Sequence, residues 1–197
     1  MKYIYAFFCL LLIGGVGQVG AFSEPDLEKL KSTNECNKCD FSGANLEGAR
    51  LRAANLEDAN LTEANLTGAD FYRVNLTNAD LTGANLYKAN LEVVDFTGTN
   101  LAGANLIDTF IEDTNLKDAN LAGADLTKAY LEATDLTGAN LTMANLTGAL
   151  LEGTNLENAD LTDAVLTDAK LNWVKNLNNA ILCRTTMPDG TVNNSGC

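Results

Sequence analysis

Histidine is absent from this chain of 197 residues, and serine is scarce. Without histidine, the chain lacks the side chain used most often for acid–base catalysis and metal binding near neutral pH. The serines are Ser23, Ser32, Ser42 and Ser195, and no glycine-rich phosphate-binding loop occurs. Because no nucleophile, base and orienting residue can be combined into a catalytic set, we expect no enzymatic activity, no cofactor and no metal centre.

Basic side chains are also in short supply. The sequence has 13 lysines and arginines against 26 aspartates and glutamates, a net charge of −13. This balance disfavours nucleic acid and anionic membrane surfaces as partners, since both carry negative charge. It favours a basic protein partner.

Only the first 20 or so residues contain a long apolar run. Lys2 precedes an uncharged, mostly apolar segment from Tyr3 to Gly17, and the small residue Ala21 follows shortly after. This pattern is typical of a secretory signal peptide, residues 1–21, cleaved after about Ala21. A retained anchor is the alternative, but the run is shorter than the ~20 residues that a spanning helix needs. Cleavage would leave 12 basic and 26 acidic residues, a net charge of −14, and no membrane contact.

The rest of the chain is dominated by a five-residue repeat. An apolar residue recurs every five positions from Phe41 to Leu171, which gives 27 consecutive pentad centres. Of these, 23 are leucine, three are phenylalanine and one is isoleucine. A small residue, mostly alanine, lies two positions before each centre, and the intervening residue is Asn or Asp in 21 of the 27 pentads.

A period of five fits neither an α-helix nor one continuous strand. Within a pentad, however, the small residue and the centre are two apart, so both can face one side of a short extended segment. The Gly, Asn, Asp and Thr residues that follow are those favoured in turns. Each pentad therefore predicts one short side and one corner, coiled so that alanine and leucine lie inside.

Pentads such as Ala44-Asn45-Leu46-Glu47-Gly48 and Ala64-Asn65-Leu66-Thr67-Gly68 resemble those of the pentapeptide-repeat family, and the resemblance covers all 27 pentads. It implies an all-β fold, a right-handed quadrilateral parallel β-helix (solenoid) with four pentads per coil and about seven to eight coils. The segments 36–40 and 183–190 also resemble those of exported cyanobacterial members. On that basis the compartment would be the thylakoid lumen or the periplasm.

The segments outside the repeat are expected to cap the solenoid, because its ends would otherwise expose the apolar core. Residues 22–38 are predicted as a capping helix, from Ser23 to Lys31, and a linker. Residues 39–173 form the repeats. Residues 174–197 form a last coil in shifted register and a C-terminal cap. One residue inserted within 172–176 explains the shift, and we expect a bulge or short helix there, with Trp173 covering the core.

Four cysteines remain after signal cleavage, and an exported protein can retain disulfides. Cys36 and Cys39 lie at one end of the expected column, while Cys183 and Cys197 lie at the other, roughly 30 Å away at ~4.8 Å per layer. Since a disulfide needs Cα atoms within ~7 Å, only the pairs Cys36–Cys39 and Cys183–Cys197 can form within one chain. Cys36 and Cys39 could also remain free thiols. The same separation excludes a four-cysteine zinc site in a monomer.

Residues 20 apart are expected to stack on one face of the solenoid, and one face departs from the repeat. Where other faces carry Asn or Asp before the centre, this face carries three large apolar residues in adjacent coils, namely Phe110, Tyr130 and Leu150. The position after the centre carries four carboxylates, namely Glu92, Glu112, Glu132 and Glu152. These seven residues are the candidate contact face, suited to a basic partner. The alternative is that the stacked apolar residues only stabilise neighbouring coils.

Three functions remain open. The first is a non-enzymatic structural or protein-interaction solenoid, exported to the lumen or periplasm, that acts as a monomer or as an end-to-end or face-to-face dimer. The second is an acidic DNA mimic that inhibits a DNA-handling enzyme, although a signal peptide argues against a cytoplasmic target. The third is a lumenal factor that responds to cations or pH, since stacked carboxylates repel one another.

Overall fold

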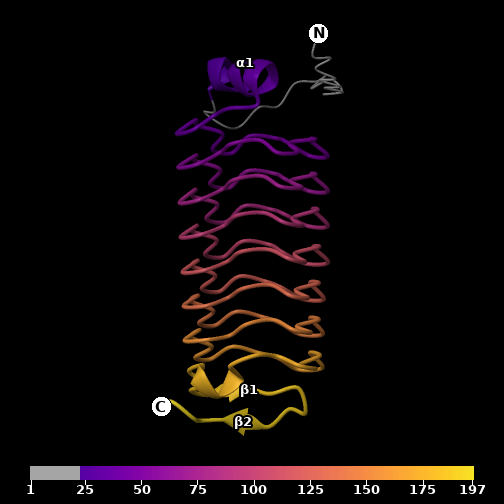
Figure 1. Cartoon of the computed structure of the whole chain (residues 1–197), viewed down its shortest axis with the longest axis vertical. Coiled ribbons are helices and arrows are strands. Elements are labelled where there is room, and N and C mark those ends of the chain that lie inside the picture. Colours follow the sequence, from indigo (N-terminus) through magenta and orange to yellow (C-terminus); the bar gives the residue numbers. More distant parts are fainter. Residues whose placement is uncertain (1–22) are drawn as a thin grey trace.

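The computed structural model describes residues 23–197, so the predicted signal peptide at residues 1–21 lies outside the described residues. The described chain forms one column of stacked coils (Figure 1). The helix α1 (Glu24–Thr33) lies at one end, and the short strands β1 (Thr185–Thr186) and β2 (Val192–Asn193) lie at the other. No helix in this part of the chain is long and apolar enough to cross a membrane.

Each regular coil uses 20 residues. The residue before a pentad centre forms a parallel β-bridge with the residue 20 positions further along, so that Asp40 bridges Asn60. Four pentads therefore complete one coil, as predicted. One column of bridged residues runs through Asp40, Asn60, Asp80, Asn100, Asn120, Asn140, Asp160 and Ile181. These eight stacked positions agree with the predicted seven to eight coils.

The corners of the coils explain the turn residues of the repeat. The second residue after each centre adopts a left-handed backbone conformation, with φ of 63° at Gly68 and 56° at Asp58. Glycine reaches this region without steric cost, and Asn and Asp tolerate it better than most residues. The amide of Ala64 then donates to the carbonyl oxygen of Leu61 (3.1 Å) and closes the turn. A pentad thus has one extended side and one tight corner.

The interior of the column is apolar throughout. All pentad centres from Phe41 to Leu166 are buried, as are the alanines two positions before them. Burying a side chain of this size contributes about 1.5–3 kcal/mol relative to exposure. The repeat thus accounts for the core.

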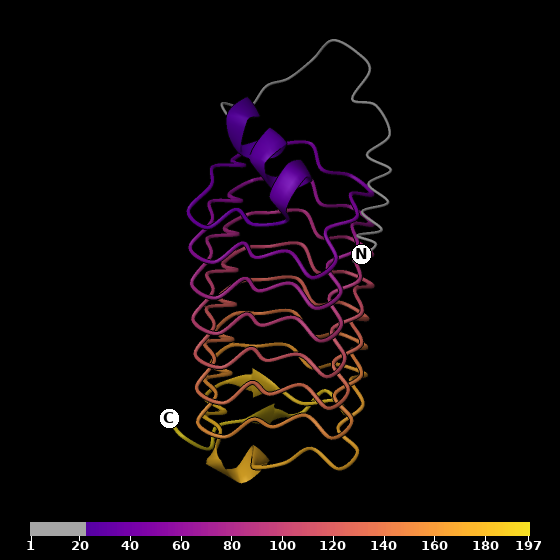
Figure 2. The ribbon, with the colours of Figure 1, turned by 45° about the horizontal axis from the view of Figure 1, so that its top comes forward.

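At the N-terminal end, α1 covers the first coil (Figure 2). Ser23 is the N-cap, as predicted, and its Oγ accepts a hydrogen bond from the amide of Asp26 (3.3 Å). Leu27 and Leu30 are buried against the column. The β-helix itself begins earlier than the predicted residue 39, because Glu35 bridges Asn55 and Cys36 is buried in the position of a pentad centre. This pentad was not recognised in the sequence because its centre is cysteine rather than the usual leucine.

At the C-terminal end, the register shifts by one residue. Lys175 still bridges Asn155 at the regular spacing, whereas Ile181 bridges Asp160 at a spacing of 21. The inserted residue therefore lies within 176–180, around the short helix η1 (Leu177–Asn179). A short helix was expected, but the regular register extends two residues beyond the predicted end at residue 173.

The prediction that Trp173 covers the core is wrong. Trp173 is 81% exposed, because it occupies a corner position with φ of 53° and corner side chains point away from the column. The end is formed instead by residues 182–197. There β1 and β2 pair antiparallel, Gly190 turns the chain with φ of 80°, and the amide of Leu182 donates to the carbonyl oxygen of Ser195 (2.8 Å).

Candidate functional site

The regular faces of the column are stabilised by ladders of side-chain hydrogen bonds. In the column through Asn100, Asn120 and Asn140, each Nδ2 donates to the Oδ1 one coil earlier, at 2.9 Å from Asn120 and 3.1 Å from Asn140. The Oδ1 of Asn120 also accepts from the amide of Ala122 (3.2 Å). The side-chain amides of such a face are therefore hydrogen-bonded to other groups of the protein.

The contact face lacks this ladder over three coils. Phe110, Tyr130 and Leu150 are bridged to one another in successive coils, as the sequence predicted, and we call them the apolar stripe. The rings of Phe110 and Tyr130 stack, with centroids 4.9 Å apart and planes inclined by 17°. Phe110 is 40% exposed. The stripe is thus an apolar surface in a column whose other positions, Arg50, Asp70, Asn90 and Lys170, are polar or charged.

The apolar stripe also removes backbone hydrogen bonds. Asn90, one coil earlier, accepts a hydrogen bond at Oδ1 from the amide of Glu92 (3.0 Å). Phe110, Tyr130 and Leu150 have no side-chain oxygen in the position of Asn Oδ1, and within residues 23–197 the amides of Glu112, Glu132 and Glu152 have no protein acceptor. A hydrogen bond of this kind contributes about 0.5–1.5 kcal/mol, so the departure from the repeat has a cost in stability.

Beside the stripe, the four glutamates form a second column, which we call the Glu ladder: Glu92, Glu112, Glu132 and Glu152. In the described part of the chain, none of their carboxylates forms a salt bridge. Burial, followed by the negative charges of Glu132, Glu92 and Asp113, raises the pKa of Glu112 above its ordinary value. The Oε2 atom of Glu132 is screened from solvent and has no hydrogen-bond partner. The ladder is therefore an uncompensated line of negative charge.

A few carboxylates elsewhere on the column form salt bridges. Asp135 contacts Lys117 Nζ at 3.2 Å, and Asp163 contacts Arg184. At the N-terminal end of the contact face itself, Asp70 Oδ2 lies 2.5 Å from Arg52 Nε, and Arg52 and Arg73 both lie over the ring of Tyr72. Acids without a salt bridge also occur on the regular faces, but the four of the Glu ladder stack in successive coils beside the apolar stripe.

The structure adds residues that the sequence analysis did not assign to this face. Val93 (42% exposed) and Trp173 occupy its corner column, at spacings of 20 that could have been recognised from the repeat. Behind the face, Thr114 Oγ1 donates to the carbonyl oxygen of Leu91 (2.6 Å), and Thr154 Oγ1 donates to that of Leu131 (2.7 Å). These buried threonines replace alanine in the coils of the contact face and hold its backbone in place.

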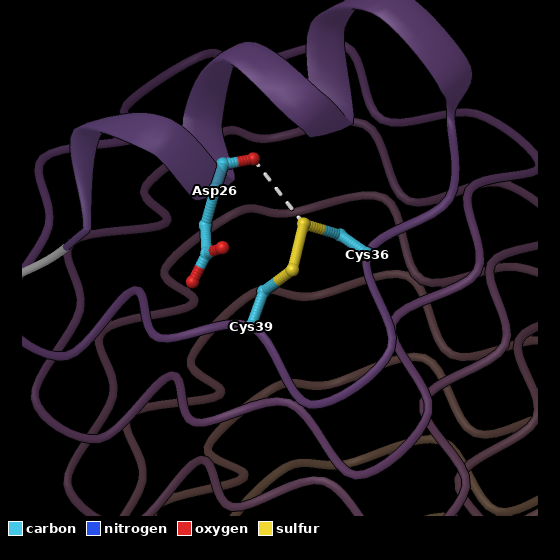
Figure 3. Close-up of side chains that lie close together, drawn as sticks. All are labelled: Asp26, Cys36 and Cys39. Atoms are coloured by element: carbon cyan, nitrogen blue, oxygen red, sulfur yellow. Dashed lines mark hydrogen bonds between the residues drawn. A yellow bond between two sulfur atoms is a disulfide. The ribbon is translucent and has the colours of Figure 1, made fainter.

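The two cysteine pairs lie at opposite ends of the column, as the sequence predicted. Cys36 and Cys39 form a disulfide with a Cα–Cα distance of 5.3 Å, and Cys183 and Cys197 form another at 4.7 Å. Figure 3 shows the first pair beneath α1, with Cys36 Sγ 3.2 Å from the carbonyl oxygen of Asp26. Both sulfur atoms are held in the disulfide, so they are not thiolate ligands for a metal. We therefore assign this pair to the attachment of the N-terminal cap.

Comparison with known proteins identifies the repeat. The sequence model of pentapeptide repeats (8 copies) matches residues 39–78, 75–113, 114–153 and 144–175. No curated protein sequence matches the chain.

Solved structures that resemble the protein are pentapeptide-repeat proteins. HetL, involved in heterocyst differentiation regulation in the cyanobacterium Nostoc, is 29% identical over 81% of this chain and 91% of its own, with a TM-score of 0.28. A protein of the Arabidopsis thaliana thylakoid lumen is 28% identical over 55% and 66%, with a TM-score of 0.32. The plasmid-mediated fluoroquinolone resistance protein QnrB1 is 20% identical over 70% and 72%, with a TM-score of 0.46. Because the family match extends over most of the chain, the predicted right-handed quadrilateral β-helix is confirmed, and the protein belongs to the pentapeptide-repeat family.

Proposed function

We propose that this solenoid binds a protein partner through the contact face and carries out no chemical reaction. The observation that carries the proposal is the stacked, part-exposed pair Phe110 and Tyr130, at a pentad position that is Asn or Asp in 21 of the 27 pentads. Large aromatic side chains in a partly exposed patch are typical of interaction sites. Within these pentads, the position before the centre is Asn or Asp everywhere on the regular faces except at Val165, and amides such as those of Asn120 and Asn140 are used in the ladders.

We further propose that the protein acts after export, in the thylakoid lumen or the periplasm. The pattern of residues 1–21 is the first support, since it is typical of a signal peptide. The second is the pair of disulfides, because structural disulfides persist mainly in oxidising compartments. Fractionation of the source cells tests this: mature protein in the cytoplasm would contradict it and would favour the DNA-mimic alternative.

Affinity capture tests the contact face. The bait is the mature protein, exposed to the lumenal or periplasmic fraction, beside the variant Phe110→Asn/Tyr130→Asn, which restores the repeat residue at both positions. We expect the main captured protein to be lost from the variant. Identical captured proteins for both baits would show that the contact face is not the binding surface.

A second candidate function is a response to cations or pH, and the Glu ladder favours it. Its four carboxylates stack without a salt bridge. The pKa of Glu112 is raised, which brings it closer to the pH of an acidified compartment. Thermal unfolding of the wild type and of Glu112→Gln/Glu132→Gln, from pH 5 to 8 with and without calcium, tests the candidate. A wild-type midpoint that depends on neither pH nor calcium would exclude it.

A further inference from the structure

We propose that the partner of the contact face is a basic, amphipathic α-helix that lies along the column axis. This inference rests on the proposed function and specifies its partner. It follows from the spacing of the apolar stripe, from the use of the backbone in the coils and from the charge of the Glu ladder.

The spacing of the stripe matches a helix. Its side chains repeat every 4.9 Å, as measured between the ring centroids of Phe110 and Tyr130. One helical turn rises about 5.4 Å, so side chains at i, i+3 or i+4, and i+7 drift by only ~1 Å against the three residues of the stripe. In an extended strand, residues on one side repeat at about 6.8 Å, which gives a drift of ~4 Å over the same three coils. A helix can therefore pack each turn against one coil.

The backbone of the coils gives a second reason to exclude a strand. The amide of Phe110 donates along the axis to the carbonyl oxygen of Ala89 (3.1 Å), and the amide of Leu131 donates to that of Leu150 (2.7 Å). These groups are paired between coils, so the flank of the column presents no strand edge to which a partner strand could add. The amides left free on this face, those of Glu112, Glu132 and Glu152, are one per coil and form no strand edge, so a partner binds mainly through side chains, as a helix does.

The Glu ladder sets the charge of the partner. It runs parallel to the stripe, two residues further along the chain where each corner begins, which is a lateral offset of at most roughly 6.6 Å. Lysine or arginine beside the apolar ridge of a helix can reach across this distance. Such cations would neutralise Glu112 and Glu132, whose carboxylates have no basic partner in the described protein.

Trp173, in the corner column of the contact face, can report binding through its fluorescence. Trp173 is the single tryptophan of the chain and lies on the contact face one coil beyond Leu150, where it is largely exposed. A helix of about 20 residues is ~30 Å long and extends past the stripe over this position. Its binding should shift the tryptophan emission to shorter wavelength.

The test uses a synthetic helical peptide of Leu, Lys and Ala, about 20 residues long, with Leu at i, i+3, i+7 and i+10 and Lys on both flanks. One control peptide has Glu in place of every Lys. The other has the same composition but alternates Leu and Lys with the period of a strand. Titration of the mature protein is followed by Trp173 emission and by the anisotropy of a labelled peptide.

We expect the helical basic peptide to bind at least about tenfold more tightly than either control, with an affinity that falls as salt rises. Glu112→Gln/Glu132→Gln should weaken binding by about tenfold, and Phe110→Asn/Tyr130→Asn by at least as much. The matched variant Glu57→Gln/Glu157→Gln removes two acids from the same pentad position on another face and should bind like the wild type.

Equal affinity for the helical and alternating peptides would overturn the helical partner. So would equal binding by the wild type and the contact-face variants, since the peptide would then lie elsewhere. If the helical peptide fails to bind while the captured partner is still lost on Phe110→Asn/Tyr130→Asn, the inference fails and the proposed function stands. If that variant captures the same proteins as the wild type, the proposed function fails.

Discussion

The contact face and the regular faces are built from the same pentads, yet they differ in where their polar groups are used. On a regular face, Asn120 donates to Asn100, and it accepts from Asn140 and from the amide of Ala122. On the contact face, Tyr130 and Leu150 break this chain of hydrogen bonds, and the neighbouring glutamates have no salt bridge in residues 23–197. On a regular face, most side-chain hydrogen-bond donors and acceptors are already paired within the protein and few are free to bind a partner. Binding should therefore be sought where the repeat is interrupted.

The largest effects should come from the core, and they should not distinguish the two faces. Leu121 lies behind a regular face and Leu131 behind the contact face, and both are fully buried. Replacing either by alanine should lower the free energy of unfolding by about 2–5 kcal/mol. Denaturant unfolding of both variants checks this. A much smaller loss for Leu131→Ala would mean that the core behind the contact face is less well packed, and the comparison between the faces would then concern more than their surfaces.

Breaking the ladder of a regular face should have the next largest effect. Asn120→Ala removes three hydrogen bonds at once, those with Asn100 Oδ1, with the amide of Ala122 and with Asn140 Nδ2. At about 0.5–1.5 kcal/mol for each bond, the loss should be roughly 1.5–4.5 kcal/mol, measured by denaturant unfolding. The same substitution at Asn194, outside the ladders, serves as the control. A loss no larger than the control's would mean that the ladders contribute little to stability.

On the contact face, restoring the repeat should change stability little. In Phe110→Asn/Tyr130→Asn, the new side chains can continue the ladder from Asn90 and accept from the amides of Glu112 and Glu132. This gain offsets the loss of the aromatic stack, which contributes about 0.5–1.5 kcal/mol beyond its buried area. We expect a net change within about 1 kcal/mol in denaturant unfolding. A loss well above that would show that the stripe is there to stabilise the coils, which is the alternative to a binding role.

The regular part of the fold could be predicted from the sequence because every pentad has the same pattern of inward-facing, outward-facing and turn-forming residues. A typical pentad has Leu and Ala that face inward and a turn former at the corner. With four pentads per coil, and so a spacing of 20 residues between coils, these apolar residues are buried in one column. The same spacing placed Phe110, Tyr130 and Leu150 in one column, and the structure confirms that column. It also separated the two cysteine pairs, which lie at opposite ends as disulfides.

What the sequence could not predict lies where the repeat ends or is interrupted. Trp173 was expected to cover the core from its hydrophobicity, but its corner position turns the side chain outward. The coil around Cys36 was missed because its centre is not leucine. The absence of a salt bridge at the Glu ladder depends on which basic side chains reach it, and that follows from three-dimensional distances rather than from spacing.

The smallest predicted effect concerns the charge of the Glu ladder. In the folded state, burial and then the charges of Glu132, Glu92 and Asp113 raise the pKa of Glu112 above the ordinary value of 4.5. The unfolded chain keeps the ordinary value, so between the two pKa values the folded protein binds more protons. The free energy of unfolding should therefore fall as pH rises through this window, which begins near pH 4.5 and extends upward.

Glu112→Gln removes this decline. Relative to the wild type, the variant should gain nothing below the window and about 0.5 kcal/mol above it, the scale of one like-charge contact between neighbouring strands. Urea unfolding at intervals from pH 4 to pH 8 measures the difference, with Glu157→Gln as the matched change at the same pentad position of a regular face. A gain that is the same at every pH, or equal for both variants, would show that the stacked carboxylates do not repel, and Glu112 would then behave like an acidic position of a regular face.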